Sequence, residues 1–217
     1  MEYLTWGSYI LSVLVAAAFV LWRMFNRNAR AERRLRSYIH RHLSDSEIGR
    51  TYERYIGHLY ETQGDSVHYH GALNGYADLG RDLIVETDEE VIIIQAKCWS
   101  RTKLIRENLV YQLYGTTAHY KFEIGNRAKK VKAILFSTTQ FSEVAQDAAK
   151  ILGVELRVQP LDRYYPMVKC AIGYAGEKTY HLPFDDNYDS IKIDRSRGEI
   201  FAKTIKQAVN DGFKRAS

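Results

Sequence analysis

Residues 81–99 read RDLIVETDEEVIIIQAKCW, and this stretch decides how the middle of the chain folds. Two runs of aliphatic, largely β-branched residues, LIV and VIII, stand on either side of the turn-like TDEE. That order predicts a β-hairpin. The second run is apolar at consecutive positions, which is typical of a strand buried on both faces.

The predicted hairpin carries polar side chains that face one another. If the turn is centred between Asp88 and Glu89, Asp82 lies directly opposite Gln95. Directly opposed residues project from the same face of a sheet, with Cβ atoms about 5 Å apart. Lys97, two residues after Gln95, projects from that face as well. We therefore expect a carboxylate, a carboxamide and an ammonium group on one patch.

These three groups suit phosphodiester hydrolysis. Carboxylate and amide oxygens are hard ligands for Mg²⁺, and Glu53 on a preceding predicted helix could add a second carboxylate. A lysine beside the metal can orient or deprotonate a water, while the metal stabilises charge on a phosphoryl oxygen. A plain Asp–Lys ion pair is the alternative. Gln95 and Lys97 interrupt an apolar run, where burying polar groups is costly without a compensating role, and this favours a catalytic site.

The elements around the hairpin predict an α/β domain. Ser44 and Asp45 are candidate N-caps for a helix that Gly64 ends. A glycine-punctuated loop follows at 71–80, and the later patterns predict a helix at 104–120, a strand at 132–138, a helix at 141–152 and a strand at 154–158. Helix, hairpin, helix, strand, helix, strand describes a mixed sheet flanked by helices.

Five segments in this order resemble the Mrr-type restriction endonuclease family, within the PD-(D/E)xK nuclease superfamily. They are YE (52–53), GRD (80–82), IIIQAKCW (92–99), ENLVYQLYGTTAH (107–119) and FSTTQFSEVAQDAAKILGVELR (136–157). The resemblance covers residues 46–162 and is a domain pattern, not a single motif. It implies an α/β, restriction-endonuclease-like fold for this domain.

The resemblance also implies a metal-dependent deoxyribonuclease, with Mg²⁺ as cofactor and Mn²⁺ as an alternative. Asp82 and Gln95 would bind the metal, with the carbonyl of Ala96 as a further ligand. Lys97 would act on the attacking water, and Glu53 would complete the metal site from its helix. The glutamine at 95 replaces the acidic residue of the superfamily motif, as is usual in the Mrr branch.

The N-terminal segment predicts a membrane anchor. Residues 3–22 contain no charged residue, and about 20 helical residues span a bilayer's hydrocarbon layer. Aromatic residues stand at both ends of this run, at Tyr3, Trp6, Tyr9 and Trp22, like interfacial belts. We therefore expect a transmembrane helix over 1–25. A cleaved signal peptide lacks its basic n-region here, and a buried core helix is disfavoured by the length and the basic flank.

Basic residues follow that run at once. Seven arginines lie between positions 23 and 41, against two glutamates in the first 41 residues, so this segment carries the whole formal charge of +5. Residues 26–45 are expected to be a basic juxtamembrane linker that contacts anionic lipid, with DNA phosphates as the alternative. The positive-inside rule places the nuclease domain in the cytoplasm, at a bacterial inner membrane.

Residues 163–217 change in character and predict a small α+β module with a closing helix near 203–210. This part is similar to a small domain appended to some bacterial thermonuclease-like proteins. Their extra cysteines, near the positions of Asp185 and Ala202, are absent, so Cys170 and His181 predict no zinc site. His68 and His70 are interpreted as polar strand residues, because two histidines make an incomplete metal site.

The resulting hypothesis is a membrane-anchored cytoplasmic endonuclease that restricts foreign, including phage, DNA. The alternatives are a catalytically inactive tether for DNA or a partner protein, and a nuclease of DNA uptake or repair. A homodimer is left open, since a double-strand break usually needs two sites. The mean hydropathy of −0.36 excludes a polytopic membrane protein, and two cysteines exclude a disulfide-rich secreted scaffold.

Overall fold

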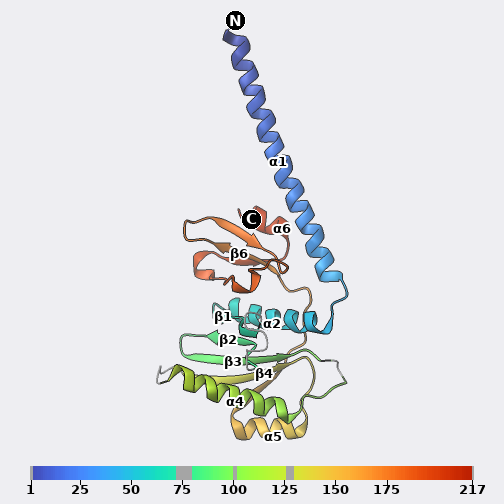
Figure 1. Cartoon of the computed structure of the whole chain (residues 1–217), viewed down its shortest axis with the longest axis vertical. Coiled ribbons are helices and arrows are strands. Elements are labelled where there is room, and N and C mark those ends of the chain that lie inside the picture. The colour runs from blue at the N-terminus through green and yellow to red at the C-terminus, as the bar shows by residue number, and fades with distance from the viewer. Residues whose placement is uncertain (1, 72–79, 100–101, 126–129, 217) are drawn as a thin grey trace.

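The computed structural model describes residues 2–71, 80–99, 102–125 and 130–216. Its α-helices are α1 (Glu2–His40), α2 (Asp45–Glu61), α4 (Glu107–Ile124), α5 (Glu143–Leu152) and α6 (Ile205–Asn210), with 3₁₀ turns η2 (Tyr188–Ser190) and η3 (Arg195–Arg197). Its strands are β1 (Ser66–His68), β2 (Leu83–Glu86), β3 (Glu90–Lys97), β4 (Lys130–Ser137), β5 (Val154–Val158), β6 (Val168–Ile172), β7 (Lys178–His181), β8 (Ile200–Ala202) and β9 (Lys214–Arg215). Figure 1 shows two sheets separated by α2, with α1 projecting beyond both.

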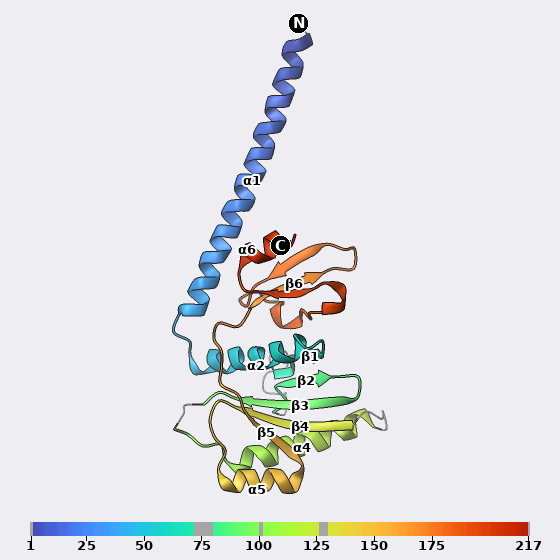
Figure 2. The ribbon, with the colours of Figure 1, turned by 180° about the vertical axis from the view of Figure 1, so that it is seen from behind.

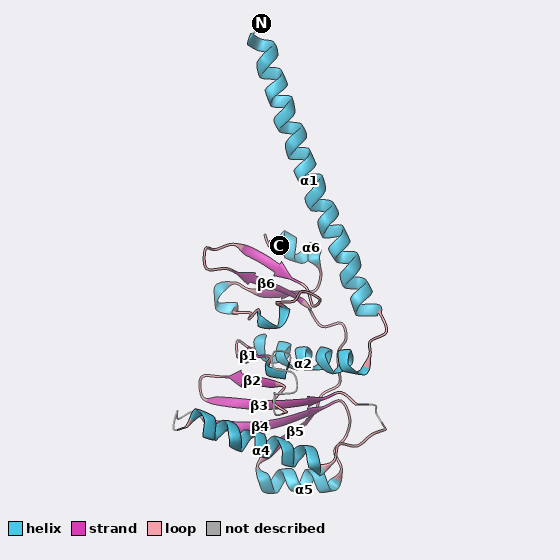
Figure 3. Ribbon diagram, in the orientation of Figure 1, coloured by secondary structure: helices cyan, strands magenta, loops and turns pink. Residues whose placement is uncertain are grey.

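The larger sheet is mixed, as the sequence predicts. Its order is β1-β2-β3-β4-β5, with antiparallel pairing from β1 to β3 and parallel pairing from β3 to β5. Helix α2 packs its aromatic residues on one face, and α4 and α5 cover the other (Figure 3). Because β3 is the middle strand and is covered on both faces, its run VIII is buried, which explains the continuous apolar stretch.

The hairpin register is the predicted one. Leu83 pairs with Ile94, and Glu86 pairs with Val91. In the turn, the Thr87 hydroxyl accepts a hydrogen bond from the backbone N–H of Glu90 at 3.0 Å. This side chain fixes the turn locally, so the register does not depend on packing alone.

Helix α2 begins where the sequence predicts. Ser44 is its N-cap, and Ser44 and Glu47 form a reciprocal capping box. The Ser44 backbone N–H donates to the Glu47 carboxylate at 2.9 Å. Such a box satisfies two of the helix's free N–H groups.

The C-terminal module, residues 163–217, forms a four-stranded sheet of order β8-β6-β7-β9 together with α6. It packs on the side of α2 that faces away from the larger sheet, as the view from behind shows (Figure 2). The small α+β module is therefore confirmed as a second sheet. Arg54 of α2 joins the two: its guanidinium donates two hydrogen bonds to Asp189, at 2.6 and 2.7 Å, and a third to the Pro183 carbonyl at 2.8 Å.

The N-terminal prediction is corrected in one respect. One helix, α1, runs from Glu2 to His40, so residues 26–40 are helical and not a linker. The reason is tertiary packing, because Ala31 and Leu35 are buried against the C-terminal module. Across the part of the chain that the structure describes, no helix combines the length and the apolar character that crossing a membrane requires. The predicted span over 1–25 is thus without structural support.

Asp189→Ala should destabilise the protein by about 3–5 kcal/mol, because it leaves a buried guanidinium without its counter-charge. Chemical denaturation of the two proteins measures this difference. Asp147→Ala is the matched control: its ion pair with Lys150 is exposed and should contribute only about 0–1 kcal/mol. If both variants lost the same free energy of unfolding, the Arg54–Asp189 pair would not hold the module to α2.

Candidate active site

Asp82 and Lys97 meet where β2 begins and β3 ends. Asp82 is only 4% exposed, and its backbone N–H donates to the Ile94 carbonyl at 2.9 Å. Its carboxylate accepts a hydrogen bond from the backbone N–H of Ala96 at 2.7 Å and lies 3.7 Å from the Lys97 ammonium. The carboxylate is therefore held by the backbone, and the lysine, whose side chain is 27% exposed, reaches it from the solvent side.

The carboxamide of Gln95 forms a hydrogen bond through its nitrogen but, among the described residues, none through its oxygen. The residue is 1% exposed, and its Nε2 donates to Gln112 Oε1 of α4 at 3.4 Å. Its Oε1 is buried and has no hydrogen-bond partner among the described residues. A buried carbonyl oxygen without a donor is costly, and a cation would satisfy it. This oxygen is the group that the sequence assigned to a metal.

Gly80 allows the two glutamines to approach. Its φ is +79°, which favours glycine. A Cβ there would lie 2.9 Å from Gln112 Nε2 and 3.0 Å from Gln95 Nε2. The backbone conformation therefore favours glycine in the GRD segment, and a larger residue there would also displace the two amides.

Glu53 lies on α2, the helix that packs on the face of the larger sheet opposite α4. Burial, followed by the negative charge of Asp82, raises the pKa of Glu53 to about 8, while Lys97 and Arg50 act in the opposite direction. The charges of Asp82 and Lys97 therefore both act on the Glu53 carboxyl group. The structure therefore brings Asp82 and Lys97 together, and a site that they share with Gln95 and Glu53 stays a prediction.

The backbone also supports the predicted role of Ala96. Its N–H points to Asp82. Since the N–H and C=O of one strand residue point to the same side, the Ala96 carbonyl faces this site too. The predicted donor set is therefore two carboxylates, an amide oxygen and a carbonyl oxygen.

This donor set fits Mg²⁺ or Mn²⁺ and does not fit zinc. Hard divalent cations take a few protein oxygens and keep their waters, whereas zinc sites use cysteine and histidine. No group of three or more His, Cys, Asp or Glu side chains gathers in a metal-binding arrangement within the described ranges. The fit with Mg²⁺ depends instead on the unpartnered amide oxygen of Gln95.

Other residues near the site have structural roles or were not foreseen. Arg81 pairs with Glu123 at 2.6 Å and lies over the Tyr120 ring, which ties β2 to α4. Gln112 was missed, because it lies on an exposed part of α4 and no pattern marks it. His68 lies 2.9 Å from the Lys192 ammonium, as an ordinary polar strand residue. Most of the predicted loop at 71–80 lies outside the described residues.

Asp82→Asn should lower the pKa of Glu53 from about 8, because it removes a neighbouring negative charge but keeps an oxygen that can accept from Ala96. Carbon-13 NMR of the glutamate carboxyl groups measures this titration. Asp194→Asn, in the C-terminal module, is the control and should leave Glu53 unchanged. An unaltered Glu53 in Asp82→Asn would show that the two carboxylates do not share a site.

Three solved structures resemble parts of the chain at low identity. A protein of unknown function named AF1548 is 18% identical, with a TM-score of 0.38, over 49% of this chain and 56% of its own. EndoMS in its apo form is 14% identical, with a TM-score of 0.36, over 56% and 48%. The MspJI restriction endonuclease in complex with a 27-mer oligonucleotide is 16% identical, with a TM-score of 0.34, over 50% and 24%.

The chain thus spans about half or less of the length of each of these proteins. Likenesses this weak do not indicate a family. No curated protein matches the chain. The family model for the Mrr-type restriction endonuclease domain matches residues 45–160, which is more than half of the chain and includes Glu53, Asp82, Gln95 and Lys97. The chain therefore belongs to the Mrr-type restriction endonuclease family.

Proposed function

We propose that this protein is a divalent-metal-dependent endonuclease that hydrolyses DNA phosphodiester bonds. The observation that carries the proposal is the buried, unpartnered Gln95 Oε1 on the strand whose end pairs Lys97 with Asp82, in a chain of this family. If Asp82 and Lys97 formed only an ion pair, the buried Gln95 Oε1 would have no reason to lack a hydrogen-bond donor. A cation held by Asp82, Gln95, Glu53 and the Ala96 carbonyl would satisfy it.

The side chains divide the chemistry between them. Bound at these oxygens, Mg²⁺ would stabilise the charge that develops on the phosphoryl oxygen. Asp82 is fixed by the Ala96 N–H and so presents its carboxylate in one orientation. Lys97 is the more exposed partner and would orient the attacking water and hold charge near it. Glu53, with a pKa of about 8, would lose its proton as it becomes a ligand.

Gln112 would act as a positioning residue. By accepting from Gln95 Nε2, it turns the amide so that Oε1 is left for a cation. A glutamine differs from the superfamily's acidic residue in being neutral, and it therefore has to be oriented to present oxygen and not nitrogen.

The biological role and location are finer parts of the same proposal. The family match supports restriction of foreign DNA as the role, and attachment to a bacterial inner membrane rests on the sequence alone. The uncharged run at 3–22 and the arginines after it support attachment. An attached nuclease would meet entering DNA before that DNA diffuses into the cytoplasm.

Lys97→Ala should reduce cleavage of supercoiled plasmid in Mg²⁺ by about 10²–10⁴-fold, since it removes the group that acts on the water. The assay compares the full chain with the variant and includes EDTA. Lys132→Ala is the matched control, because Lys132 pairs with Glu155 on the same sheet, away from the site. DNA binding without cleavage by the wild type would favour the non-catalytic tether instead.

Gln95→Glu should lower the Mg²⁺ concentration needed for half-maximal cleavage, and Gln95→Ala should raise it, because a carboxylate binds Mg²⁺ more tightly than a neutral amide. A titration of Mg²⁺ at fixed DNA measures both shifts. Gln159→Ala is the control outside the site. If neither variant moved the metal requirement, Gln95 would not be a ligand.

A further inference from the structure

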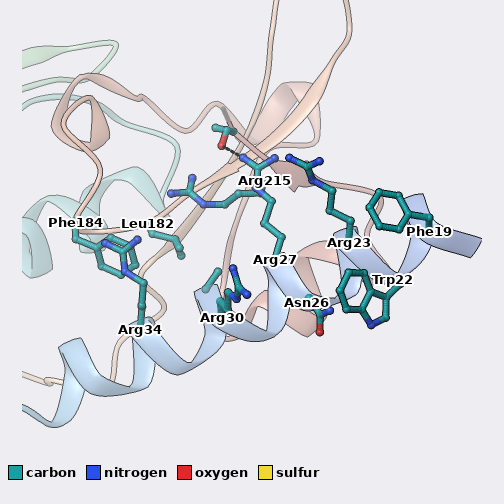
Figure 4. Close-up of a pocket in the computed structure, with 12 residues that line it drawn as sticks. Phe19, Trp22, Arg23, Asn26, Arg27, Arg30, Arg34, Leu182, Phe184 and Arg215 are labelled. Carbon is teal, nitrogen blue, oxygen red and sulfur yellow. Dashed lines mark hydrogen bonds between the residues drawn. The ribbon is translucent and has the colours of Figure 1, made fainter. Parts of the chain in front are cut away.

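A cavity of about 730 Å³ lies between α1 and the C-terminal module, apart from the candidate active site. Figure 4 shows that α1 lines it with Arg23, Arg27, Arg30 and Arg34, and that Arg215 of β9 faces them. Among the described residues that line it there is no aspartate or glutamate. Its volume is that of a small-ligand site.

Helical spacing places the four α1 arginines on one face, and packing turns that face towards the module. Leu35 is buried against the module, and the Glu32 carboxylate accepts from the backbone N–H of Ile205 at 3.0 Å. The rotation of α1 is thereby fixed. Arg33, on the same segment, does not line the cavity.

The positive charge of the cavity is only partly compensated. Arg27 donates to the Ala216 carbonyl at 2.9 Å, and Arg34 lies 4.4 Å from the centre of the Phe184 ring. Arg215 is paired with Asp185. Among the described residues, the four α1 arginines make no ion pair. Like charges on one helix face repel, so an anion in the cavity would relieve this repulsion.

The outer end of the cavity is apolar. Phe19 and Trp22 line it, with ring centroids 5.9 Å apart. Beyond them on α1, Val13, Leu14 and Val15 are each at least 60% exposed. A ligand matching this arrangement has a phosphate at one end and hydrocarbon at the other. DNA could place a phosphate among the arginines but has no hydrocarbon for the apolar end of the cavity. A phospholipid has both a phosphate and hydrocarbon chains.

We propose that the cavity binds the headgroup phosphate of an anionic phospholipid in a bilayer, with the acyl chains beside the apolar part of α1. The proposal rests on the membrane attachment proposed above and not on the nuclease chemistry. Under this proposal the protein binds the membrane through the cavity between α1 and the C-terminal module. The basic segment of α1 would not be sufficient by itself. Since the module is fixed to α2, the lipid would also orient the nuclease domain.

The test is flotation of the full chain with vesicles of phosphatidylcholine alone or mixed with phosphatidylglycerol. Wild type should bind the mixed vesicles more tightly. Arg30→Gln should weaken this binding by roughly fivefold or more, and Arg33→Gln, with the same change in charge, by less than about twofold. Both replaced side chains are exposed, and an unfolding transition unchanged from wild type in each variant would confirm that it folds.

Other results would overturn the proposal. Equal losses in the two variants would mean that the charge acts diffusely, without a site. Equal flotation of wild type with both vesicles would remove the headgroup site but keep attachment, whereas no flotation with either would remove attachment as well. A loss of DNA binding in Arg30→Gln with unchanged lipid binding would assign the cavity to DNA. Competition by inorganic phosphate at matched ionic strength would assign it to a free anion.

Discussion

The pairing of β2 with β3 is the constraint on which the rest of the structure depends. β3 is the middle strand of the larger sheet, and helices pack on both of its faces. A slip of one residue would turn every side chain of a strand to the opposite face, so that Asp82 would no longer meet Lys97. The Thr87 turn and the bond from Asp82 N–H to the Ile94 carbonyl both hold this register. The site is therefore a consequence of the same pairing that builds the core.

A second level of organisation is the position of α2 between the two sheets. Its aromatic side chains pack on the larger sheet, and Arg54 reaches the C-terminal module through Asp189 and Pro183. Glu53, the adjacent residue, belongs to the candidate site. The module thus fixes the helix that carries a site carboxylate, and α1 is fixed to the same module by Leu35 and Glu32. The arginine-lined cavity and the candidate site are connected through packed, buried contacts.

Much of the larger domain could be predicted because its signals are local. Apolar runs, the Thr87 turn and the Ser44 cap each act within a few residues, and strand alternation then places Asp82, Gln95 and Lys97 together. What could not be predicted depends on contacts between distant segments. Gln112 meets Gln95 only when α4 packs on the sheet, and the fit of Gly80 against both amides needs all three segments in place.

The sequence by itself determined the order of elements and the hairpin register, because periodicity and turn chemistry encode them locally, and it predicted the site residues through a family resemblance. The tertiary structure decided the rest. It showed that residues 26–40 continue α1 and are not a linker, since Ala31 and Leu35 find a buried surface on a module more than a hundred residues away. It also decided which arginines share a cavity, because Arg215 joins those of α1 through a contact that no sequence pattern contains.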